Sequence, residues 1–87
     1  MTIICEQKLE SVNTAMENSC NNIKLLIEKC EGIFKLTNSL IEDNGKHLTL
    51  ASVNRISVYF KEVHSIQTKL AIEQKRLYDH YTYRNEL

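Results

Sequence analysis

The chain has 87 residues, of which 43% are apolar and 25% charged, with eleven basic against eleven acidic side chains, no proline and two glycines. A chain of this size forms at most one domain and leaves little room for a catalytic cavity. Its zero net charge and frequent apolar residues exclude a polyanion-binding tail and a disordered chain, and its composition favours helix over β structure.

The first periodic segment covers residues 3–43, where apolar side chains recur at alternating steps of three and four. With Leu9 as heptad position a, nine of the twelve a and d positions are apolar, which predicts a helix with one buried seam. These positions are Thr2, Cys5, Leu9, Val12, Met16, Ser19, Ile23, Leu26, Cys30, Ile33, Thr37 and Leu40. Position e adds Cys20, Ile27, Phe34 and Ile41. The stripe is thus wider than a two-helix seam, and it predicts more than one neighbouring helix.

Two features interrupt this first helix. The polar stretch 18–22 either forms a register-fixing layer with Gln67 and Gln74 or breaks the helix and gives three helices in all. The absence of glycine and proline from the stretch favours a continuous helix. Gly32 marks either a close helix contact or a bend, since a helical glycine costs about 1 kcal/mol relative to alanine.

A turn is predicted at residues 44–47, because Gly45 can adopt the left-handed conformation that ends a helix. The second helix is expected over residues 48–85, with Thr49 or Ser52 as its N-cap. Its seam is predicted from apolar residues seven apart and their neighbours. These are Ile56, Val63, Leu70 and Leu77, with Val53, Phe60 and Ile66 beside them.

The charges support an antiparallel pairing of these two helices. Residues 1–45 carry four Lys and seven Asp or Glu, a balance of −3, and residues 46–87 carry seven Lys or Arg and four Asp or Glu, a balance of +3. A register in which residue i faces residue 91 − i brings opposite charges together and places Phe34 near Phe60. Residues 1–87 are therefore expected to form a single all-α, antiparallel two-helix hairpin of coiled-coil type, which completes a helical bundle with a partner chain.

The expected location is a reducing compartment, the cytoplasm. Cys5, Cys20 and Cys30 are odd in number, and a helical separation of ten residues is about 15 Å, too far for a disulfide. The segment before Glu6 is too short for a signal peptide, and no apolar run is long enough to insert into a membrane.

No enzyme site or cofactor site is expected. His47, His64 and His80 lie far apart, the cysteine spacings differ from those of zinc sites, and two isolated glycines cannot form a phosphate loop. The basic and aromatic residues of segment 75–84 allow an alternative, a helical nucleic-acid-binding protein. An aromatic anchor for a protein partner, or a plain solvated helix end, are the other interpretations of this segment.

The leading hypothesis is a non-enzymatic interaction module, a small subunit or co-chaperone that packs against helices of a partner in a hetero-oligomeric assembly. The expected partner-binding residues are Leu9, Val12, Met16, Ile23, Leu26, Ile27, Leu70, Leu77 and Tyr81. A self-contained homodimeric bundle is a further alternative. In architecture alone the chain is similar to helical-hairpin subunits of kinetochore or vesicle-tethering complexes and to co-chaperones of bacterial secretion systems.

Overall fold

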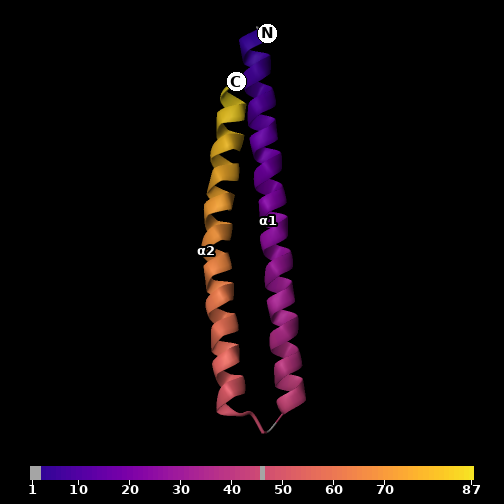
Figure 1. The fold of residues 1–87 in the computed structure, drawn as a ribbon. Helices are drawn as coiled ribbons and strands as arrows, with labels where there is room; N and C mark the ends of the chain where they lie inside the picture. The colour runs from indigo at the N-terminus through magenta and orange to yellow at the C-terminus, as the bar shows by residue number, and fades with distance from the viewer. Residues whose placement is uncertain (1–2, 46) are drawn as a thin grey trace.

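The chain folds into two long helices that lie side by side and run in opposite directions (Figure 1). The computed structural model describes residues 3–45 and 47–87, and side chains from residue 6 onward except those of Asn44 and Lys46. Helix α1 spans Ile3–Asn44 and helix α2 spans Leu50–Glu86. The Cα atoms extend over 68 × 15 × 14 Å. The predicted all-α antiparallel hairpin is therefore confirmed, whereas Thr2, Lys46 and the Cys5 side chain lie outside the described part.

Helix α1 is continuous through the polar stretch 18–22, so the three-helix alternative is wrong. Every a and d position from Leu9 to Leu40 is buried or half-buried, as the spacing predicted, and the e positions are exposed. The seam tolerates polar side chains because a hydroxyl can bond to the helix itself. Thr37, which is buried, donates from Oγ1 to the carbonyl oxygen of Ile33 at 2.9 Å.

The turn is built by Gly45 and Thr49. Gly45 has φ of +49°, and its N–H donates to the carbonyl oxygen of Ile41 at 2.8 Å, so the expected glycine ends α1. Thr49 caps α2, because its hydroxyl oxygen accepts a hydrogen bond from the Ser52 N–H at 3.1 Å. With Thr49 as the cap, α2 begins at Leu50, two residues later than expected.

The seam of α2 also follows steps of four and three. Its buried and half-buried positions are Ser52, Ile56, Tyr59, Val63, Ile66, Leu70, Glu73, Leu77, His80 and Arg84. The four anchors seven residues apart are thus in the seam. Ser52 and Tyr59 take the places expected for Val53 and Phe60, which are 44% and 56% exposed. The expected polar layer is wrong in detail: Gln67 and Gln74 are exposed, and Glu73 occupies the seam.

The register of the hairpin differs from the expected one. Asn13 contacts Arg84, where the rule 91 − i gives Tyr78, and Ile33 packs with Val63, where it gives Val58. The shift of five to six residues arises partly from the later start of α2, which moves the centre of the turn toward the C-terminus. The expected interhelix ion pairs are accordingly absent among the described side chains, whose one salt bridge lies within α2.

The core between the two helices is thin. Its buried apolar residues are Val12, Ile33, Val63 and Ile66, and no described side chain is less than 2% exposed. The accessible surface is 6823 Å² for a 10.1 kDa chain. A compact monomer of that mass exposes about 5,300 Å² according to the usual scaling. The hairpin therefore leaves roughly 1,500 Å² more surface in water than a globular chain of its size.

Candidate partner-binding surface

The seam divides the hairpin lengthwise into two flanks. Both helices are right-handed and run in opposite directions, so the e positions of α1 and α2 border the same side of the seam, and the g positions border the other side. Two surface hollows agree with this assignment. One is lined by Cys20 and Met16 of α1 with Gln74, Leu77, Tyr78 and Tyr81 of α2. The other is lined by Asn22, Leu25 and Leu26 with Lys69, Ile72, Glu73 and Arg76.

The first flank, which we name the apolar face, is formed by the e positions. Its ten residues are Asn13, Cys20, Ile27, Phe34 and Ile41 of α1 with Val53, Phe60, Gln67, Gln74 and Tyr81 of α2. None of the ten is charged, and Glu6 is the first charge met beyond Asn13. All ten are exposed, including Phe34 at 47% and Phe60 at 56%. Large apolar side chains in water along a whole flank are typical of an interaction surface.

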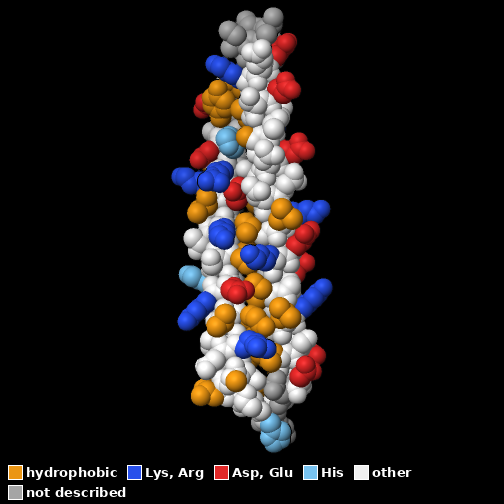
Figure 2. Space-filling model, viewed as in Figure 1, with side chains coloured by type: hydrophobic (Ala, Val, Ile, Leu, Met, Phe, Trp, Pro, Cys, Tyr) orange, Lys and Arg blue, Asp and Glu red, His pale blue; other side chains and the backbone are white. Residues whose placement is uncertain are grey.

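The second flank, which we name the charged face, is formed by the g positions. Its residues are Lys8, Ala15, Asn22, Lys29, Leu36 and Asp43 of α1 with Arg55, Glu62, Lys69, Arg76 and Tyr83 of α2. Seven of these eleven are charged. Figure 2 shows a side of the hairpin on which basic and acidic side chains border the line between the helices. The two flanks thus differ sharply in chemistry, although both border the same seam.

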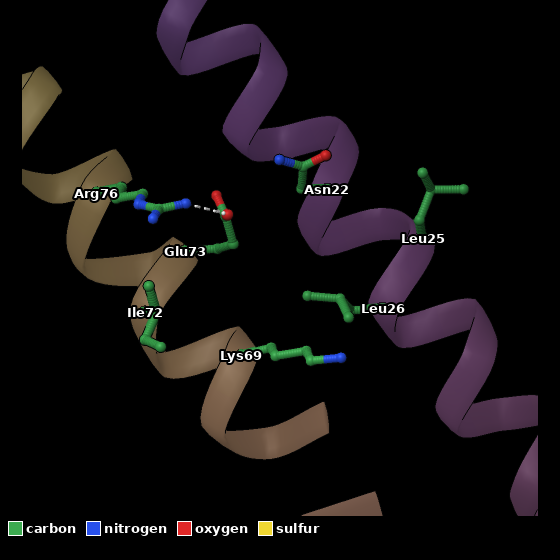
Figure 3. Close-up of a pocket in the computed structure, with 7 residues that line it drawn as sticks. All are labelled: Asn22, Leu25, Leu26, Lys69, Ile72, Glu73 and Arg76. Atoms are coloured by element: carbon green, nitrogen blue, oxygen red, sulfur yellow. Dashed lines mark hydrogen bonds and ion pairs between the residues drawn. The ribbon is translucent and has the colours of Figure 1, made fainter. Parts of the chain in front are cut away.

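The hollow on the charged face is centred on Glu73. Figure 3 shows the Glu73 carboxylate directed from α2 toward α1, beside Leu26 and Asn22. The Glu73 residue is 8% exposed, and its carboxylate accepts a hydrogen bond from Arg76 Nη1 at 2.8 Å. Arg76 therefore keeps a charge in the seam paired, which limits its cost to the hairpin.

The expected partner-binding residues fall into two groups. Ile27 and Tyr81 lie on the apolar face and are 45% and 47% exposed. Six others lie in the seam and are half-buried, namely Leu9, Met16, Ile23, Leu26, Leu70 and Leu77. The ninth, Val12, is 6% exposed and so packs within the hairpin itself. A helix laid along the apolar face would reach the edges of five of these half-buried residues, which are a positions next to the e positions. Leu26 is a d position and lines the hollow on the charged face instead.

The sequence interpretation left out most of the apolar face. Phe34, Ile41, Val53 and Phe60 were not among the expected partner-binding residues, yet each is at least 44% exposed. The signal was present in the heptad pattern of α1, where the e positions widen the apolar stripe. In α2 the apolar pattern does not mark the seam, because Glu73, His80 and Arg84 occupy seam positions. Without the seam, the pattern does not show that Phe60 and Tyr81 lie on the same flank.

At the basic and aromatic end of α2, two arginines contact other residues of the hairpin. Arg76 pairs with Glu73, and Arg84 Nη1 donates to Asn13 Oδ1 at 3.2 Å. Arg84 also lies over the ring of Tyr81, with Cζ 5.5 Å from the ring centroid. Two of the cations in segment 75–84 therefore serve internal contacts, and Lys75 is the third.

The described part of the chain contains free thiols but no metal-binding cluster. No group of three His, Cys, Asp or Glu side chains there could hold a metal ion. Cys20 is a free thiol on the apolar face, and Cys30 is a free, half-buried thiol in the seam. Neither helix, over its described residues, has a stretch long and apolar enough to cross a membrane.

Comparisons with known proteins do not extend these observations. Neither the family models, nor the curated proteins, nor the solved structures include a match to this chain.

Proposed function

We propose that this chain is a non-enzymatic interaction module, whose hairpin packs its apolar face against helices of a second polypeptide. The observation that carries this proposal is the chemistry of that face. It presents ten uncharged residues in a continuous strip, and six of them are large apolar side chains that are 44–56% exposed. The g positions of the charged face include two large exposed apolar side chains, Leu36 at 55% and Tyr83 at 42%, and Leu25 and Ile72 line the hollow beside them.

The thin core supports the same proposal. A two-helix hairpin buries each seam residue from one side only, so most of its apolar seam stays half-buried. Ordering the backbone costs about 1–2 kcal/mol per residue, and a core whose buried apolar residues are Val12, Ile33, Val63 and Ile66 offsets little of this cost. Helices laid on the apolar face would bury both that face and the open edge of the seam.

Within this proposal the chain is a small subunit or co-chaperone of a helical assembly. Its proposed location is the cytoplasm, where free thiols such as that of Cys20 remain reduced. A nucleic-acid-binding role finds less support, because Arg76 pairs with Glu73 and Arg84 bonds to Asn13, so part of the basic charge is already matched within the chain. Nucleic-acid affinity would fall steeply with added salt, so a binding titration at two salt concentrations separates the two functions.

The test compares one lysine on each flank. Phe34→Lys places a charge on the apolar face, and Leu36→Lys places it on the charged face at similar exposure, 47% against 55% for the native side chains. Each variant is used to capture partners, including tagged copies of the chain itself, from the native cell. We expect Phe34→Lys to lose what the native chain captures and Leu36→Lys to retain it. Equal retention by both variants would refute the apolar face as the binding surface.

A further inference from the structure

The apolar face has the properties of a surface that pairs with its own copy. Its ten residues are uncharged, and the charge in contact with them is the Arg84 guanidinium, which bonds to Asn13 and lies over Tyr81 at the terminal end. Over the rest of their length, two such faces brought together do not repel each other. The whole chain has a net charge of zero, which also removes long-range repulsion between copies. Covering the apolar face with a second copy would remove from water part of the surplus surface of roughly 1,500 Å² that the elongated hairpin exposes.

Two face-to-face arrangements have two-fold symmetry. If the axis runs along the hairpin, the two turns lie at the same end and each α1 lies next to the α2 of the other copy. If the axis runs across the hairpin, the turns lie at opposite ends and each α1 lies next to the other α1. The hairpin's own charges and side chains discriminate between these arrangements.

The charge of the two helices favours the axis along the hairpin. Residues 1–45, which include α1, carry four Lys and seven Asp or Glu, and residues 46–87, which include α2, carry seven Lys or Arg and four Asp or Glu. With the axis along the hairpin, each negatively charged α1 lies next to two positively charged α2 helices, one from each copy. The crosswise axis would place α1 against α1 and α2 against α2. The charges of residues 3–44 and 50–86 make this −3 against −3 and +2 against +2, which is unfavourable along two lines of contact.

The distribution of apolar side chains along the face favours the same arrangement. The half nearer the turn carries Ile27, Phe34, Ile41, Val53 and Phe60, with Gln67 level with Ile27 at its boundary, and the half nearer the termini carries Asn13, Cys20, Gln74 and Tyr81. With the turns at one end, each apolar half covers the other apolar half. With the turns at opposite ends, the two phenylalanines would instead face amides and a thiol.

The b positions of the heptads provide a third indication. In the lengthwise arrangement they border the new line of contact between α1 of one copy and α2 of the other. Tyr78, which is 68% exposed in the hairpin, occupies a b position of α2 and lies at about the height of Glu17, a b position of α1. In the dimer, the second copy would bury part of the Tyr78 ring, and its Glu17 carboxylate would accept a hydrogen bond from the Tyr78 hydroxyl.

We propose that the second polypeptide is a second copy of this chain, and that the two hairpins join through their apolar faces into a four-helix bundle with both turns at one end. This inference rests on the proposed function and names the partner of the same surface. Every pair of adjacent helices in the bundle is antiparallel, as in other up-and-down bundles.

The first experiment is sedimentation equilibrium of the purified chain, of Leu36→Lys, and of a further variant of the apolar face, Phe60→Lys. The native chain and Leu36→Lys should sediment at twice the 10.1 kDa of the monomer. Phe60→Lys should raise the dissociation constant by roughly a hundredfold or more, because the two-fold axis places each substitution in the interface twice. A monomeric native chain, or a Phe60→Lys variant as dimeric as Leu36→Lys, would overturn the proposal.

The second experiment tests the direction of the hairpins. A benzophenone amino acid replaces Phe60, and chains of two isotopic compositions are mixed so that links between copies can be recognised by mass. Links from position 60 should reach residues 27–41 of the other copy. Links to residues near Asn13 or Gln74 would instead establish the crosswise arrangement and contradict ours.

The two proposals fail in different ways. If the pure chain is a poorly folded monomer, but Phe34→Lys still abolishes capture of an unlike partner and Leu36→Lys does not, the second copy is wrong and the interaction module stands. If the pure chain is a stably folded monomer at every concentration and both variants behave like it, both proposals are wrong.

Discussion

Arg84 Nη1 donates a hydrogen bond to Asn13 Oδ1 at 3.2 Å, and this contact joins the end of α2 to the beginning of α1. It lies where the seam is least apolar, since His80 and Arg84 are the last two seam positions of α2. The contact therefore adds a polar link between the helices at an end where the seam of α2 offers polar side chains to the buried Val12 of α1.

Removing this acceptor should have a small, local effect. Asn13→Ala should lower the free energy of unfolding by about 0.5 kcal/mol, because the hydrogen bond is exposed to water. Asn18→Ala, at an exposed position of the same helix, serves as the control. Urea denaturation measures both, and an equal loss for the two variants would show that the Asn13 contact contributes nothing.

The packing of the core predicts a much larger difference between two isoleucines of α2. Ile66 is 3% exposed and packs with Ile33 and Val63, whereas Ile72 is 48% exposed. Ile66→Ala should cost about 2–4 kcal/mol through lost burial and the cavity left behind. Ile72→Ala should cost about 0.5 kcal/mol or less. Comparable losses in thermal unfolding would mean that the seam is not where the hairpin derives its stability.

The two glycines should respond in opposite directions to alanine. Gly32 is helical, and no neighbouring group lies within 4 Å of the place that a Cβ atom would occupy, so it marks no close contact inside the hairpin. Gly32→Ala should therefore stabilise the hairpin by about 1 kcal/mol. Gly45 has φ of +49°, and Gly45→Ala should cost about 1 kcal/mol or more through strain. Unfolding midpoints in urea check the pair, and a loss at Gly32 would indicate a contact with another chain.

Glu73 is the charged residue that the seam buries most. Replacing it with leucine removes the desolvation cost of the carboxylate and fills the same space with apolar atoms. Glu73→Leu should raise the free energy of unfolding by about 1 kcal/mol, and Glu28→Leu on the exposed side of α1 should change it by less than about 0.5 kcal/mol. A net loss for Glu73→Leu would show that its ion pair with Arg76 contributes more than its burial costs.

The heptad spacing predicted α1 closely and α2 only in part, and the reason is chemical. The seam of α1 is mostly apolar, so steps of three and four identified each position from Leu9 to Leu40. The seam of α2 includes Glu73, His80 and Arg84, which a pattern of apolar residues cannot identify. The register depends on the residue that caps α2, and either Thr49 or Ser52 was compatible with the sequence.

The candidate surface was predicted in outline from the e positions of α1, such as Ile27 and Phe34. Its continuation onto α2 required the correct seam, because a shift of one position exchanges Tyr59 with Phe60 and changes which side chains face outward. The separation of an uncharged flank from a charged one therefore became visible only once both helices were placed in register.

The most direct test of the central claim, that a second chain covers the apolar face, is thermal unfolding of the pure chain over about a hundredfold range of concentration. Circular dichroism at 222 nm follows the helices at ~1 µM and above. We predict a low, broad transition when the chain is dilute and a midpoint that rises steadily with concentration. A sharp transition with the same midpoint at every concentration, from a chain that sediments as a monomer, would contradict it.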